Sequence, residues 1–179
     1  SYMTSGSGTS AVREWTDSAN APTGKFTRLR KVAIRTDDGG ISDSIDIRRP
    51  LTVEITFDVL KPGAVLLPHF GLQNESGTTA FVAVDLDPEW RQRPRPKGRY
   101  TSIAHIPGHL LAEGLHYVNC YILTLNPQSM ELKERSAVSF TVVDSPDGDS
   151  ARGDYSKNMP GAVRPLLKWE TNFEPAEQV

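Results

Sequence analysis

Alternation of apolar and polar residues is the strongest pattern in this chain. From Leu51 to Val59 (LTVEITFDV) every odd position is apolar and every even position is polar. Successive side chains of a β-strand point to opposite faces of a sheet, so this segment predicts a strand with one buried and one wet face. A strand that is wet on one face is typical of antiparallel sheets.

Shorter runs of the same kind follow along the chain, and turn residues such as Pro62-Gly63, Ser76-Gly77 and Asn126-Pro127 separate them. A single short helical turn is expected over residues 107–114. Short strands at near-regular spacing predict an all-β fold, an antiparallel β-sandwich. We expect about eight strands, at Phe26–Arg35, Leu51–Val59, Ala64–Leu72, Thr79–Val84, Tyr100–Ile106, His116–Leu125, Ala137–Val143 and Val163–Trp169.

The same pattern divides the chain into regions. We expect a flexible N-terminal arm over residues 1–24, pinned to the domain surface by Trp15, and a sandwich body over 25–143. A polar connector over 144–161 leads to a strand at 162–171 and a tail at 172–179. The connector is long for a compact domain, and such loops usually bind something or link domains. Because the chain begins with Ser1 and not Met, we expect it to be a piece of a longer protein.

Composition excludes several classes of function. The net charge of -2 and the pI of about 6.1 provide no general attraction to nucleic acid or anionic lipid. A single cysteine, Cys120, excludes an intrachain disulfide and suits a reducing compartment. The sequence contains neither an apolar run of the roughly 20 residues that span a bilayer nor a signal-peptide pattern. We therefore expect a cytoplasmic protein.

Signals for enzymatic chemistry are weak. Asp85, Asp87 and Glu89 lie beside Trp90, but closeness in sequence does not place two carboxyl groups across a glycosidic bond. The four histidines lack the spacing of a metal site, and the Gly24-Lys25 pair lacks the rest of a Walker motif. We expect this chain not to be an enzyme and to need no cofactor or metal. A glycan-active enzyme remains the weakest alternative.

The strand after Gly114 offers a candidate binding face, and two interpretations are open. The Leu-Gly-Tyr spacing before Tyr117 fits a tyrosine corner, which would make that residue structural. Alternatively, His116, Val118, Cys120 and Ile122 are buried, which avoids burying an asparagine and leaves the intervening residues on the open face. Phenol rings and an amide on one face suit sugar recognition. We favour the second register, with a carbohydrate site formed by Tyr117, Asn119 and Tyr121 and aided by His69, Gln73 and Arg30.

Basic residues gather in two clusters. Charge runs usually form a solvated surface, but arginine can also grip a carboxylate or phosphate with two parallel hydrogen bonds. Both interpretations are open for these segments, and nucleic acid is not expected as a partner. The clusters are Lys25, Arg28, Arg30, Lys31 and Arg35, and Arg91, Arg93, Arg95 and Lys97.

Three separated blocks of the chain resemble one family. The block from Met159 to Trp169 (MPGAVRPLLKW), preceded by Arg152-Gly153-Asp154-Tyr155, resembles the terminal signature of the C-terminal domain of the ATP-binding subunit of bacterial polysaccharide ABC exporters, the Wzt type. Residues 106–114 (IPGHLLAEG) and 47–55 (IRRPLTVEI) are similar to two further blocks of that family, in the same order. The resemblance extends over residues 15–171.

The resemblance implies a β-sandwich of immunoglobulin-like or jelly-roll type that binds the capped non-reducing end of an O-antigen polysaccharide and couples chain termination to export. It also implies a homodimer in which the last strand crosses to the partner. The further partners would be the nucleotide-binding domain, an ATPase, and the membrane subunit, which would hold the protein at the inner membrane. A ligand-free immunoglobulin-like interaction module is the alternative.

Overall fold

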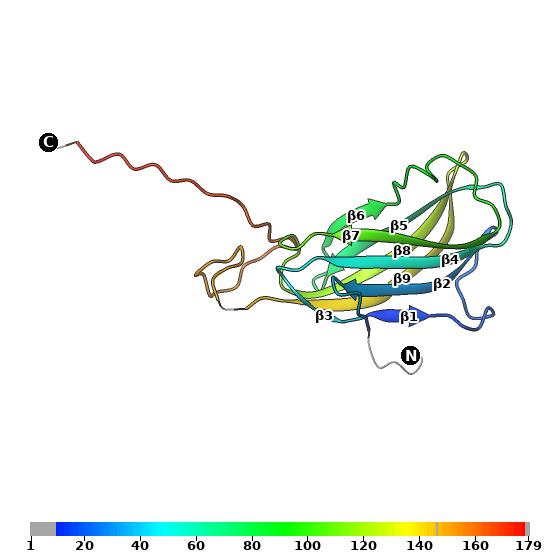
Figure 1. Ribbon diagram of the computed structural model, residues 1–179, viewed down its shortest axis with the longest axis horizontal. Helices are drawn as coiled ribbons and strands as arrows, with labels where there is room; N and C mark the ends of the chain where they lie inside the picture. The colour runs from blue at the N-terminus through cyan, green and yellow to red at the C-terminus, as the bar shows by residue number, and fades with distance from the viewer. Residues whose placement is uncertain (1–9, 146, 178–179) are drawn as a thin grey trace.

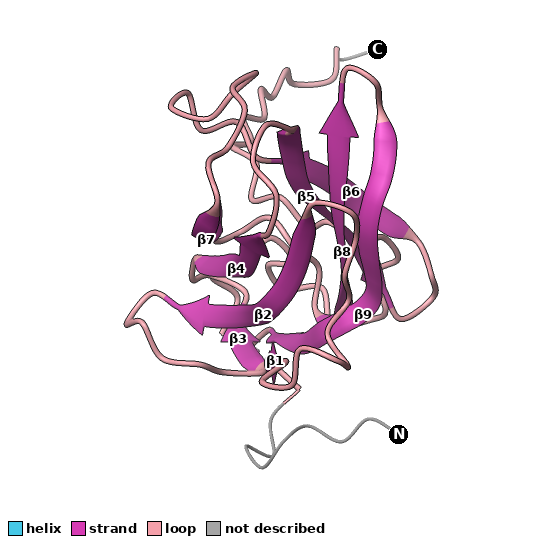
Figure 2. Cartoon of the chain, turned by 90° about the vertical axis from the view of Figure 1, so that its right-hand side faces the viewer, coloured by secondary structure: helices cyan, strands magenta, loops and turns pink. Residues whose placement is uncertain are grey.

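The computed structural model describes residues 10–145 and 147–177, and nine strands form two facing sheets (Figures 1 and 2). The four-stranded sheet has the order β1-β2-β4-β7, and the five-stranded sheet has the order β3-β9-β8-β5-β6. The all-β sandwich is therefore confirmed. The strands are β1 Val12–Glu14, β2 Thr27–Thr36, β3 Ser44–Asp46, β4 Leu51–Val59, β5 Val65–Asn74, β6 Thr79–Val84, β7 Gly98–Ile106, β8 Gly114–Leu125 and β9 Ser129–Val143.

Alternation along the strands builds the core between the sheets. In β4 every odd residue from Leu51 to Val59 is buried and every even one is partly exposed. In β8 the register that buries His116, Val118, Cys120 and Ile122 is confirmed. These side chains bury apolar surface, which is the main driving force for folding. Burial also raises the pKa of the Cys120 thiol to about 12, so this thiol stays protonated.

Two short strands were not predicted, because three residues are too few to show alternation. One of them, β1, lies within the arm predicted as flexible and pairs with β2 through Val12 and Ala33. Ala11 is fully buried and Trp15 is 8% exposed, so this part of the N-terminal segment belongs to the sandwich. Trp15 is thus packed against the domain as expected, and residues 1–9 of the predicted arm lie outside the described residues.

The C-terminal region differs from the prediction in two places. Residues 107–114 form bends and a bridge and not a helical turn; the described residues contain no helix, hence none that could cross a bilayer. The strand expected at Val163–Trp169 is not formed within this chain. Val163 makes one bridge to Leu111, and the chain beyond Arg164 is extended and leaves the body (Figure 1). Among the described residues, the segment after Arg164 belongs to neither sheet.

Ion pairs dock the connector on the sandwich, and Glu113 takes part in two of them. Glu113, which precedes β8, accepts hydrogen bonds from Arg152 at 3.0 Å and from Arg164 at 2.8 Å. Arg152 also contacts Asp144 at 3.2 Å. Arg164 donates to two backbone carbonyls of the connector as well. Polar residues therefore order a segment that is too hydrophilic to form a core of its own.

A second carboxylate ties the two sheets together at one end. Glu131 of β9 accepts hydrogen bonds from the backbone N–H groups of Lys25, Phe26 and Thr27 at 2.7 to 2.9 Å, and from the Thr27 hydroxyl at 2.6 Å. Gly24 allows this approach, because a Cβ there would lie 2.2 Å from the Glu131 carbonyl oxygen. The carboxylate satisfies backbone donors that begin β2 in the opposite sheet.

Replacing Glu131 with alanine should destabilise the protein by about 2–3 kcal/mol, because several partly buried backbone donors lose their acceptor. Urea unfolding followed by circular dichroism measures this change. Glu134→Ala is the matched control on the same strand: it removes an ion pair with Arg13 at the surface and should cost under about 1 kcal/mol. Equal losses in the two variants would contradict the role given to Glu131.

Stability should also fall as the pH drops below about 6.5 because of His116. Burial lowers the pKa of this histidine from its ordinary value of 6.5, although a hydrogen bond with the Ala112 carbonyl at 2.8 Å opposes the shift. The unfolded chain therefore binds a proton at a pH where the folded protein does not, so acid favours unfolding. Urea unfolding between pH 5 and 7 should show this slope, and His116→Phe should reduce it. The same slope in both proteins would contradict the assignment.

Candidate functional site

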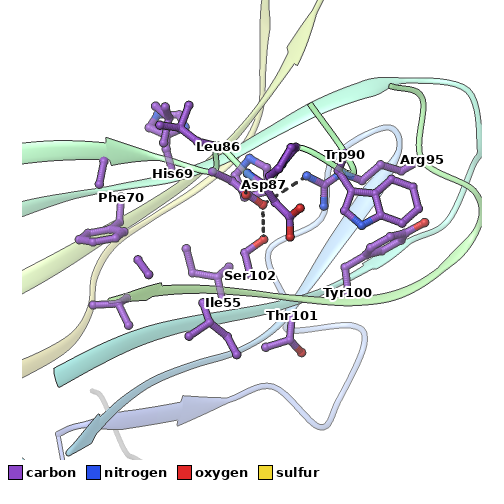
Figure 3. A pocket seen from close by; sticks show the side chains of 18 residues that line it. Ile55, His69, Phe70, Leu86, Asp87, Trp90, Arg95, Tyr100, Thr101 and Ser102 are labelled. Atoms are coloured by element: carbon purple, nitrogen blue, oxygen red, sulfur yellow. Dashed lines mark hydrogen bonds and ion pairs between the residues drawn. The ribbon is translucent and has the colours of Figure 1, made fainter. Parts of the chain in front are cut away.

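A cavity of about 510 Å³ lies between the two sheets at the edges formed by β6 and β7 (Figure 3). Core-facing residues of β4 and β7, among them Ile55 and Ser102, line one wall. Phe70 of β5 and Ala83 of β6 line another, and the loop 85–97 that links β6 to β7 closes one side. The volume is within the range of roughly 300–1,000 Å³ that is typical of ligand sites.

The cavity exists because small residues occupy core-facing positions of β7. In β7 the inward side chains are Tyr100, Ser102 and Ala104, and the last two pair with Ile55 and Val53 of β4. A hydroxyl and a methyl group occupy positions where larger apolar side chains would fill the space between the sheets. The sheets are therefore not closed by side chains along this edge.

A polar cluster lies in the middle of the cavity, centred on Asp85. Its carboxylate accepts hydrogen bonds from the Ser102 hydroxyl at 2.7 Å, the Arg95 guanidinium at 3.3 Å and the backbone N–H of Asp87 at 3.0 Å. Burial would raise the pKa of Asp85, but these hydrogen bonds outweigh it and lower the pKa below the ordinary value. The carboxylate is therefore ionised at neutral pH.

Arg95 fixes the loop that closes the cavity. Its side chain is 3% exposed, and its guanidinium lies 5.3 Å from the ring centre of Tyr100 and 5.6 Å from those of Phe57 and Trp90. The rings of Trp90 and Tyr100 meet edge to face at 5.2 Å. The Nε atom of Arg95 is buried and has no hydrogen-bond partner within the described chain. This cation is thus held by one carboxylate and by aromatic faces.

Five of the six residues predicted as a carbohydrate site lie together on β5 and β8, on the outer face of the five-stranded sheet. His69 is opposite Tyr121, and Gln73 is opposite Tyr117. The His69 and Tyr121 rings stack at 5.1 Å, and His69 also lines the cavity. The outer face of β5 and β8, which the sequence predicted as the binding site, therefore borders the cavity at His69.

Asn119 lies on this face but is only 6% exposed. Its side chain accepts a hydrogen bond from the Ser136 backbone N–H at 2.8 Å and donates one to Gln73 at 3.2 Å. Ser136 has a φ of 48° and lies where the pairing of β8 with β9 shifts register. The prediction that Asn119 is open on the sheet face is wrong, because the amide supports an irregular strand.

Arg30 is not part of this group. It lies on β2 in the other sheet, 3.5 Å from Asp58 and 3.3 Å from the Ser18 hydroxyl. Of the second basic cluster, Arg95 enters the cavity. Sequence reasoning missed Tyr100 and Ser102 as site residues. It considered Arg95 only as part of a possible anion-binding cluster and Asp85 only as part of a catalytic pair. Two features of the sequence could have indicated this cavity: the carboxylate-rich segment next to Trp90 and the small residues in β7.

Comparisons with known proteins identify the fold. No family model matches the chain, and a search of curated proteins found no match. The crystal structure of the C-terminal domain of Wzt superposes with a TM-score of 0.63 at 13% identity, covering 85% of this chain and 87% of that chain. The chain has the fold of the Wzt C-terminal domain. The resemblance noted in the sequence is thereby confirmed for the fold.

A second solved structure, Northeast Structural Genomics Consortium target SoR45, superposes with a TM-score of 0.32 at 11% identity, covering 66% of this chain and 89% of that chain. This similarity is too low to support an argument. Among the described residues, no group of three or more histidine, cysteine, aspartate or glutamate side chains could hold a metal ion. The cavity instead combines an ionised acceptor, a hydroxyl, a guanidinium and aromatic rings, a set suited to binding polyhydroxylated molecules.

Proposed function

We propose that this chain is a carbohydrate-binding module that recognises the non-reducing end of an O-antigen polysaccharide and couples chain termination to export by an ABC transporter. The observation that carries the proposal is the cavity at the β6–β7 edge, with ionised Asp85 held between Ser102 and Arg95. The fold shared with the Wzt C-terminal domain supports it.

The cavity contains the chemistry that a sugar needs. Asp85 can accept a hydrogen bond from one hydroxyl, and the Arg95 guanidinium can donate to a neighbouring oxygen. The Tyr100 ring offers an apolar face for the C–H side of a pyranose. A cavity closed on one side by the loop 85–97 suits the end of a chain better than its middle.

The outer face of the five-stranded sheet would hold the sugars that follow. The His69 Nδ1 atom lies 3.1 Å from the Leu67 carbonyl oxygen, which can only accept, so Nδ1 donates this hydrogen bond and Nε2 is left for a ligand. Tyr121 of β8 lies opposite His69 of β5, and Tyr117 follows further along β8 on the same face. This path leads away from the cavity along the face that the sequence predicted.

We further propose that the module works on the cytoplasmic side of the inner membrane, as part of a longer protein with a nucleotide-binding domain, and next to a membrane subunit. The polar cluster favours a ligand over the alternative of a ligand-free immunoglobulin-like module, since a buried charged pair is costly unless further hydrogen bonds satisfy it. A glycan-active enzyme would need two carboxyl groups on opposite sides of a substrate. Asp87 also lines the cavity, but it lies two residues from Asp85 on the same loop.

Glycan binding should depend on both parts of the site. Asp85→Asn should weaken binding of the cognate polysaccharide by about tenfold to a hundredfold, since a hydrogen bond to a charged acceptor is lost. Tyr121→Ala should weaken it less if the cavity holds the chain end. Ligand-observed NMR with the polysaccharide, intact and lacking its terminal residue, measures both effects.

Asp37→Asn is the control, because Asp37 forms a surface ion pair with Arg49 at 2.9 Å and does not line the cavity. Circular dichroism should show that all three variants are folded. Unchanged binding in Asp85→Asn, or equal signals from the intact and shortened glycans, would refute recognition of the chain end in this cavity.

The exposed C-terminal tail supports a homodimer, which we also propose. Leu166, Leu167, Trp169 and Phe173 are 51% to 84% exposed, an unusual amount of apolar surface for an extended segment. A strand that crosses to a second copy would bury them and pair their backbone groups. Arg164, just after the connector, is still held by Glu113, so the crossing segment begins after Arg164.

Truncation after Arg164 should convert a dimer into a folded monomer, because it removes these apolar side chains and keeps the contacts of Arg152 and Arg164 with Glu113. Size-exclusion chromatography with light scattering measures the mass. A substitution of Glu177 with Gln, beyond the apolar residues, is the control and should remain dimeric. A truncated chain that still forms a stable dimer would contradict the proposal.

A further inference from the structure

The cavity changes in character along its length. The inward side chains of β7 run from Tyr100 through Ser102 to Ala104. Trp90, Arg95 and Tyr100 lie at one end, Ser102 lies in the middle, and Phe70 lies at the other end (Figure 3). One end therefore offers charge and aromatic faces, and the other end offers small and apolar groups.

Apolar side chains form the second end. Val53 and Phe70 are 1% and 2% exposed, and Ala83 and Ala104 contribute only methyl groups to the lining. Phe70 also packs edge to face against Phe81 at 6.2 Å, which fixes its ring. A ligand group that enters this end loses its water and meets methyl and ring carbons, so a hydroxyl group there would lose its hydrogen bonds.

The polar cluster around Asp85 and Ser102 restricts which hydrogen-bonding groups a ligand can carry. Ionised Asp85 can only accept hydrogen bonds, and Ser102 already donates its proton to it. A ligand group at this carboxylate must therefore donate a hydrogen bond, as a free hydroxyl group does. A sugar with an O-methyl group at that position would have no proton to donate, whereas a methyl group bound to carbon leaves every ring hydroxyl free.

We propose that the cavity binds a terminal 6-deoxyhexose, with ring hydroxyls at Asp85 and Arg95 and the methyl group on C5 in the apolar end beside Phe70 and Ala104. This inference rests on the proposed function and names the class of sugar for the same site. A hexose with a hydroxymethyl group on C5 would place a hydroxyl in the apolar end.

The test compares sugars that differ only at C6. Methyl α-D-rhamnopyranoside is paired with methyl α-D-mannopyranoside, and methyl α-L-fucopyranoside with methyl α-L-galactopyranoside. Saturation-transfer NMR and calorimetry on the full chain measure the affinity of each sugar. In a pair that binds, the 6-deoxy sugar should have an affinity about ten to a hundred times higher than its hydroxymethyl counterpart. The C6 methyl protons should receive the strongest saturation. A 3-O-methyl mannoside distinguishes a methyl group on oxygen from one on carbon and should not bind better than the mannoside.

Two variants test whether the preference for the 6-deoxy sugar arises at the apolar end of the cavity. Ala104→Ser places a hydroxyl at the apolar end and should reduce the ratio of deoxy to hydroxymethyl affinity several-fold. Ala80→Ser is the matched control, since Ala80 lies on β6 and does not line the cavity. Its ratio should equal that of the unchanged protein.

Each other outcome is decisive. If both members of a pair bind equally, and Asp85→Asn weakens both, the glycan site stands and the 6-deoxyhexose assignment is wrong. If the O-methyl sugar binds best, the methyl group belongs on oxygen and the assignment is also wrong. If no sugar or polysaccharide binds, the proposed function fails and this inference fails with it.

Discussion

The buried charge of Arg95 is the constraint on which the edge of this sandwich depends. A guanidinium removed from water requires a carboxylate and polarisable surroundings. Asp85 supplies the first, and the rings of Phe57, Trp90 and Tyr100 supply the second. The loop from β6 to β7 carries both Asp85 and Arg95, so its path follows from the need to bring them together over β7. The space beside them is the cavity.

Between β2 and β9, a carboxylate plays the corresponding role without a cation. Glu131 receives backbone and hydroxyl donors from the chain that enters β2. Strand β2 belongs to one sheet and β9 to the other, so the sheets are joined there. One region of the sandwich is thus closed by polar contacts, while another stays open between β6 and β7.

The fold could be predicted from the sequence because its main signal is local. Alternation in β4 and the apolar set Val118, Cys120 and Ile122 specify which faces are buried, whatever the strands pair with. The cavity could not be predicted in this way, because it depends on the pairing of Ser102 with Ile55, two residues far apart in the chain. The burial of Asn119 could not be predicted for a similar reason. Its partners, Gln73 and Ser136, come from other strands, and hydrogen bonds made by them compensate for its burial.

Glu113 has a consequence for the entropy of the C-terminal region. Because it holds Arg152 and Arg164 at once, the connector between them loses its conformational freedom when the single chain folds. Fixing a backbone residue costs roughly 1–2 kcal/mol, so ordering a free connector on association would be a large penalty. With Arg164 anchored, that penalty applies only to the residues after it. The tail is therefore presented from a fixed point, and an association through the tail would have to immobilise only a short segment.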